Sequence, residues 1–164
     1  MRALFILLAV GLSACSTVDL RPAAPAPAGL TPDAAGLQPA GTDLRIDFGR
    51  AQEGVIETVS RLLGSDPVDI GTIEECGAGP VTTAYWDVGL MLNFIDGDFD
   101  GWALVEPGLT AAGGLEAGTP PPPGVTMTET TLGREFEIDG VWALVEDGGP
   151  DMTHVWSGTQ CFFR

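Results

Sequence analysis

The sequence has 164 residues, enough for one ordinary domain, and a formal net charge of −16, with 23 acidic residues against 7 basic ones. All of the basic residues are arginines. So acidic a chain excludes nucleic acid as a partner, because phosphates require basic side chains. It also excludes attachment to anionic lipid through charge alone. The simplest role of this charge is to keep the domain in solution.

The first fifteen residues have the pattern of an export signal. Met1 and Arg2 precede an apolar run over residues 3–12. That run is too short for a permanent membrane helix and fits the h-region of a signal peptide. It ends in Leu12-Ser13-Ala14-Cys15, which resembles the lipobox of bacterial lipoproteins at all four positions. The resemblance implies cleavage after residue 14 and lipid attachment to Cys15. An ordinary signal peptide with a chance cysteine is the alternative.

Lipid attachment predicts a location. Each buried CH₂ of an acyl chain contributes about 0.8 kcal/mol, so two or three chains at Cys15 would hold the protein stably in a membrane. We expect the domain on the periplasmic or extracellular side of a bacterial envelope. Ser16 follows the cysteine. By resemblance to sorted lipoproteins, this favours the outer membrane in a cell that has one.

Beyond the signal peptide, over residues 1–14, the composition predicts two segments. Residues 15–42 are rich in alanine and carry five prolines, which predicts a disordered, partly polyproline tether. Residues 43–164 form the predicted exported domain. It opens with a helix over residues 50–63, whose apolar residues recur on one face. Gly64 and then Pro67 end that helix.

The rest of the domain predicts short strands. Asp96-Gly97 is a hairpin signal, and the four prolines at 120–123 force a loop. The expected fold class is α+β, with one amphipathic helix packed on an antiparallel β-meander. The expected strands are Val81–Trp86, Leu90–Ile95, Phe99–Val105, Val125–Thr131, Glu135–Ile138, Val141–Val145, Thr153–Trp156 and Gln160–Phe163.

One strand sequence occurs twice. Residues 101–106 read Gly-Trp-Ala-Leu-Val-Glu, and residues 141–146 read Val-Trp-Ala-Leu-Val-Glu. The repetition predicts a duplicated strand unit, whose tryptophans and leucines cover the helix. Chance similarity in a chain rich in glycine and alanine is the alternative.

Two cysteines lie in the domain, Cys76 and Cys161. Exported compartments are oxidising, so an even pair most simply forms a disulfide. Two free thiols or half of a metal site are the alternatives. Zinc normally takes four closely spaced ligands, which these two cysteines and a single histidine do not supply.

Three features invite a functional interpretation. Asp96, Asp98 and Asp100, followed by Gly101, begin like a calcium loop, but Pro107 occupies the position that requires glutamate. The only histidine, His154, has Asp151 and Ser157 nearby, yet no nucleophile turn or oxyanion signal accompanies it. We expect it to be a half-buried structural residue.

The domain also has four tryptophans, for which core packing is the first interpretation and a platform for sugars or peptides the second. These are Trp86, Trp102, Trp142 and Trp156.

The domain resembles a group of short, uncharacterised lipoproteins, mostly from alphaproteobacteria. The resembling stretches are Arg45–Arg50, Glu75–Pro80, Phe99–Trp102 and Gly158–Arg164. The group implies no activity, although such sequences are sometimes labelled aspartate-semialdehyde dehydrogenase. This chain does not support that chemistry, because it lacks a glycine-rich nucleotide loop between a strand and a helix.

We therefore expect a non-catalytic exported domain, anchored to a membrane at Cys15, that meets an envelope protein or ligand. No cofactor is expected. The alternatives are a module that binds Ca²⁺ or a small ligand through Asp96, Asp98 and Asp100, and an enzyme of unknown reaction.

Overall fold

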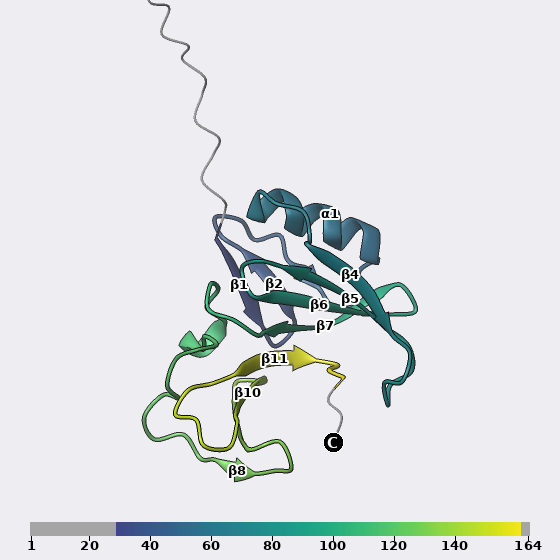
Figure 1. The fold of residues 1–164 in the computed structure, drawn as a ribbon. Helices are drawn as coiled ribbons and strands as arrows, with labels where there is room; N and C mark the ends of the chain where they lie inside the picture. The colour runs from purple at the N-terminus through teal and green to yellow at the C-terminus, as the bar shows by residue number, and fades with distance from the viewer. Residues whose placement is uncertain (1–28, 162–164) are drawn as a thin grey trace, which may run out of the picture.

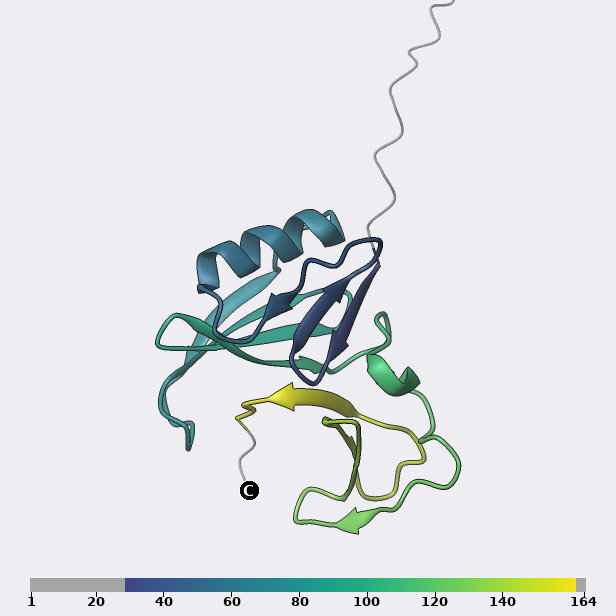
Figure 2. The same cartoon turned by 180° about the vertical axis from the view of Figure 1, so that it is seen from behind.

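Two antiparallel sheets and one long helix make up the part of the chain that the computed structural model describes, residues 29–161 (Figures 1 and 2). The large sheet has eight strands in the order β4-β5-β6-β7-β11-β10-β9-β8, and the small sheet has three in the order β1-β2-β3. The elements are β1 Leu30–Asp33, β2 Gly36–Pro39, β3 Ile46–Asp47, α1 Gln52–Leu63, β4 Asp69–Ile73, β5 Val81–Trp86, β6 Leu90–Ile95, β7 Asp98–Leu104, the 3₁₀ turn η1 Ala112–Gly114, β8 Thr128–Glu129, β9 Arg134–Ile138, β10 Val141–Val145 and β11 His154–Gly158.

The expected α+β fold, a helix packed on a meander, is wrong, because the described chain is mostly β-structure. The helix buries only Val55 and Val59 completely, too little surface to cover an eight-stranded sheet. It lies over the β4–β7 half of that sheet, next to the small sheet (Figure 1). The rest of the core is closed by apolar residues of the β7–β8 connection, such as Leu115, and by Met152.

The tether predicted for residues 15–42 is wrong for residues 29–42, and its remainder lies outside the described residues. Two strands, β1 and β2, form there and pair antiparallel. Pro32 is tolerated because β1 is an edge strand, and Pro39 because it ends its strand. The Trp102 indole donates a hydrogen bond to the Asp33 carbonyl at 2.7 Å, so the large sheet holds this hairpin in place.

Several local predictions are confirmed. The helix ends at Leu63, and Gly64 adopts the left-handed conformation with φ of 73°. Strands β5, β6 and β10 have the predicted bounds. Asp96 and Gly97 both have positive φ, as a tight hairpin turn requires. The strand expected over Val125–Thr131 is only two residues long, and the one expected over Gln160–Phe163 is wrong for residues 160 and 161.

The duplicated strand unit is also wrong. The two copies lie on either side of β11, but their registers differ by one residue: Trp102 pairs with Ser157, whereas Trp142 pairs with Trp156. A shift of one residue turns every side chain to the opposite face of a sheet. Trp102 is therefore completely buried in the main core, whereas Trp142 is 43% exposed on the other face.

Candidate functional site

The large sheet packs one face on the main core and leaves the other partly open. A row of directly paired residues crosses five strands of the open face; it consists of Tyr85, Met91, Ala103, Trp156 and Trp142. Paired residues of antiparallel strands point to the same side, and so does Leu144, two residues after Trp142. We call these six residues the tryptophan face.

A stacked pair of indoles lies at the β10 end of the tryptophan face. The rings of Trp142 and Trp156 have centroids 6.4 Å apart and planes inclined by 22°. Trp156 is only 6% exposed and packs with Ala103 and Leu144 in a second, smaller cluster. Trp142 lies over this cluster with 43% of its surface exposed. One exposed indole is therefore supported by a buried apolar cluster of a hydrogen-bonded sheet, where little side-chain freedom remains to be lost on binding.

Titratable groups border this surface. Burial lowers the pKa of His154, and the carboxylate of Glu146, 3.9 Å from its Nδ1, only partly offsets that effect. Burial and the neighbouring carboxylate of Glu106 raise the pKa of Tyr85. Glu137 pairs directly with Trp142 across the β9–β10 ladder and is exposed. The border of the tryptophan face is therefore mainly acidic.

Residues 159–161, which we call the C-terminal strap, cross the same open face. The Asn93 amide donates to the Thr159 carbonyl at 2.8 Å and to the Gln160 side chain at 2.9 Å. Gly101 lies beneath the strap, and a β-carbon there would come within 2.4 Å of the Thr159 oxygen. Only glycine fits this close approach.

The strap brings Cys161 to Cys76, in the β4–β5 connection. Burial and the hydrogen bond with the Cys76 thiol raise the pKa of the Cys161 thiol to about 11. The structure holds both residues as free thiols. The two predicted partners thus lie in contact, and the disulfide between them stays a prediction.

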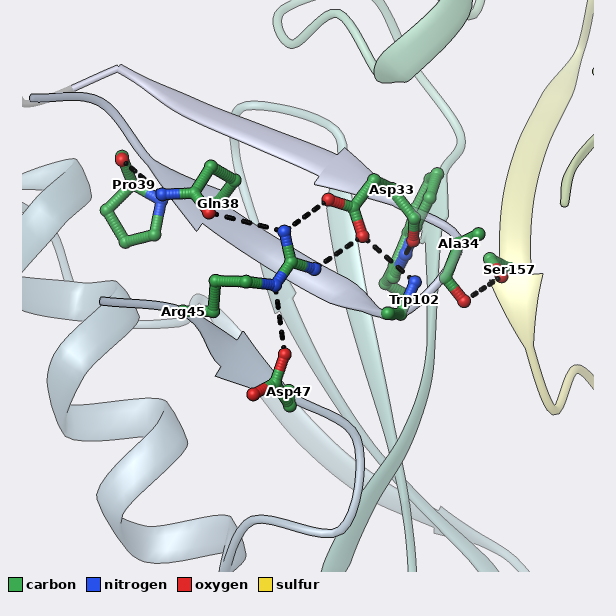
Figure 3. A network of polar contacts seen from close by, with 9 residues as sticks. Asp33, Ala34, Gln38, Pro39, Arg45, Asp47, Trp102 and Ser157 are labelled. Carbon is green, nitrogen blue, oxygen red and sulfur yellow. Dashed lines mark hydrogen bonds and ion pairs between the residues drawn. The ribbon is translucent and has the colours of Figure 1, made fainter. Parts of the chain in front are cut away.

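A network of polar contacts fixes the β1–β2 hairpin against β3 and the large sheet (Figure 3). The Arg45 guanidinium donates two hydrogen bonds of 2.7 Å to Asp33 and one of 3.0 Å to Asp47. The bonds to Arg45 lower the pKa of Asp33 and raise that of Arg45. Ser157 Oγ donates to the Ala34 carbonyl at 3.2 Å. Every group in this network has a partner inside the fold, which indicates a structural role.

The three aspartates proposed for Ca²⁺ are not brought around a common point. Asp96 occupies the tight turn, while Asp98 and Asp100 already belong to β7. A calcium loop must wrap around its ion, and a two-residue turn leaves no chain to do so. Within residues 29–161, no three His, Cys, Asp or Glu side chains are placed to share a metal ion.

His154 and Ser157 do not form a catalytic pair. They are three positions apart in β11, so their side chains lie on opposite faces of the sheet. The ring of His154 contacts the Thr153 hydroxyl at 3.1 Å, and Ser157 donates to a backbone carbonyl on the core side. His154 is half-buried, as predicted.

The four tryptophans divide between core and surface. Trp86 and Trp102 are completely buried, and each indole donates to a backbone carbonyl. Trp156 is buried in the smaller cluster, and Trp142, stacked on it, is the tryptophan that is exposed.

No family model, curated protein or solved structure matches this chain. The resemblance to short alphaproteobacterial lipoproteins therefore stays a prediction. No helix within residues 29–161 has the length and apolar character needed to cross a membrane.

Proposed function

We propose that the protein is a lipid-anchored exported domain that binds an envelope partner through the tryptophan face. The anchor rests on the Leu12–Cys15 motif, which lies outside the described residues. The binding role rests on one observation: an indole that is 43% exposed and stacked on a second indole, on the open face of a sheet.

Exposed tryptophan on a rigid support is the residue type that contributes most to binding interfaces. Trp142 is the exposed part of an apolar cluster, because Ala103, Leu144 and Trp156 beneath it are apolar and buried. The carboxylates at the border, Glu106, Glu137 and Glu146, favour a partner whose contact surface is neutral or basic.

We further propose that the role is non-catalytic. The residues that could have formed a serine triad, His154 and Ser157, face opposite sides of the sheet. The cysteine with a resolved pKa, Cys161, has it raised rather than lowered, which is the reverse of what a thiolate nucleophile needs.

The test is recovery of a partner from chemically cross-linked envelopes of cells that produce the full-length protein. Trp142→Ala is compared with the wild type and with Val68→Ala, which removes another exposed apolar side chain, 56% exposed, outside the tryptophan face. We expect the same partner from the wild type and from Val68→Ala, with a large loss for Trp142→Ala. Absence of a reproducible partner, or equal recovery by all three proteins, would refute the proposal.

A further inference from the structure

A second surface feature lies between α1 and the chain that leads from β2 to α1; Figure 2 shows α1 beside the small sheet. It is an open groove of about 580 Å³. One wall is a stripe of the helix and the other is the chain from the end of β2 to the start of α1. The lining residues are Pro39, Thr42, Leu44, Arg45, Ile46, Arg50, Ala51, Gly54, Val55, Thr58 and Leu62.

The groove is mostly apolar and is not filled by the described chain. Leu44, on its rim, is 78% exposed, the most exposed large apolar residue within residues 29–161. Gly54 lies in the helix wall, where a β-carbon would meet no atom within 4 Å. Glycine inside a helix costs about 1 kcal/mol of stability relative to alanine. Within the described residues, no neighbouring atom requires glycine at this position.

The chain enters the fold beside this groove. The Ala40 amide donates to the Gly29 carbonyl at 2.7 Å, which continues the antiparallel β1–β2 pairing by one residue. Because the pairing is antiparallel, Gly29 lies opposite Ala40, two residues before Thr42. Thr42 is part of the groove wall.

The segment that precedes Gly29 has a composition that fits the groove. Residues 22–28 read Pro-Ala-Ala-Pro-Ala-Pro-Ala, without a charge. A polyproline helix rises about 3.1 Å per residue, so these seven residues reach about 22 Å. The helix wall from Ala51 to Leu62 is about 16 Å long at 1.5 Å per residue. The segment is therefore long enough to follow the whole groove.

We propose that residues 22–28 dock in this groove as an extended polyproline segment of the same chain. Proline-rich segments bind apolar grooves because little conformational freedom remains to be lost. Direct attachment at Gly29 also gives the segment a high effective concentration at the groove. Docking takes up about 22 Å of the chain between Cys15 and the domain. If Cys15 carries the proposed anchor, the docked state holds the domain closer to the membrane.

The test places a photoreactive benzoylphenylalanine at Thr58, inside the groove, in the full mature chain in membranes. Glu57 is the matched control, because it is exposed, adjacent in sequence and absent from the groove lining. After irradiation and digestion, with the cross-linked residue located by tandem mass spectrometry, we expect position 58 to be joined to residues 22–28, and little of this product from position 57. Cross-links from position 58 to lipid, to a second copy or to another protein, or no cross-link at all, would overturn the proposal.

A second measurement does not alter the groove. In the variant with Pro22, Pro25 and Pro27 all changed to serine, the tether keeps its length but loses its polyproline preference. We expect the NMR amide shifts of Gly54 and Thr58 to change, while that of Ile70, which does not line the groove, stays as in the wild type. Unchanged shifts at Gly54 and Thr58 would contradict docking. Neither readout depends on the tryptophan face, so the two proposals fail independently.

Discussion

Replacing Cys161 by serine should destabilise the domain strongly if the Cys76–Cys161 disulfide forms in the exported protein. The two thiols are already in contact in the structure. They lie 85 positions apart, so the bond would close almost the whole large sheet into one loop. For a loop of that length, chain entropy gives about 4–5 kcal/mol before native strain is subtracted. Small domains have only about 5–15 kcal/mol in total.

The assay is a thermal melt of the wild type, with and without reductant, beside Cys161→Ser. A loss of this size lowers the Tm by roughly 15 °C in a domain of this length. Reduced wild type and Cys161→Ser should melt together, because both lack the bond. Thiol titration of the denatured, unreduced protein should find neither Cys76 nor Cys161 reactive. Two titratable thiols, or a Tm that is the same with and without reductant, would refute the disulfide.

Three further outcomes are expected. Cys15→Ser should abolish fatty-acid labelling and leave an uncleaved precursor; label retained by the variant would disprove the anchor. The hydrogen bond from Arg45 lowers the pKa of Asp33 in the fold. The contribution of Asp33 to stability is therefore present above its unfolded pKa of about 3.8 and is lost as the pH falls through the folded value. Asp33→Asn should remove this acid sensitivity and lower the free energy of unfolding by about 1–3 kcal/mol, measured by urea unfolding at pH 3 and pH 7. Burial lowers the pKa of His154 from 6.5, so the stability of the fold should decrease as the pH drops from about 6.5 towards the folded value. In His154→Gln, the Tm should change less between pH 7.5 and pH 5 than in the wild type. The same dependence of Tm on pH in both proteins would contradict the burial of His154.

The local signals in the sequence predicted the elements near the centre of the chain. The helix, its glycine end and the hairpin at Asp96-Gly97 follow from periodicity and turn chemistry, which act over a few residues. The β1–β2 hairpin was missed because its prolines and alanines resemble a tether. Its order comes from long-range contacts, such as the bond from Trp102 to Asp33, which no local pattern shows.

The exposed position of Trp142 could not be predicted from the sequence, because it depends on the pairing register of β10 with β11. The repeated Trp-Ala-Leu-Val sequence predicts equivalent positions for Trp102 and Trp142, yet a one-residue difference in pairing with β11 places them on opposite faces. Pairing register depends on the partner strand, and nothing inside either copy reports it. The contact of Cys76 with Cys161, by contrast, was predictable from the even count of cysteines in an exported domain.

The binding role of Trp142 is tested by the affinity of the purified partner for the wild-type protein and for Trp142→Ala, with Trp142→Phe as the conservative variant. Truncation of a tryptophan at the centre of an interface costs at least about 2 kcal/mol, or roughly 30-fold in Kd. We expect a loss of that size for Trp142→Ala, with partial recovery by phenylalanine, while far-ultraviolet circular dichroism and an unchanged cooperative melt show that the fold is intact. Equal Kd values for the wild type and Trp142→Ala would contradict it.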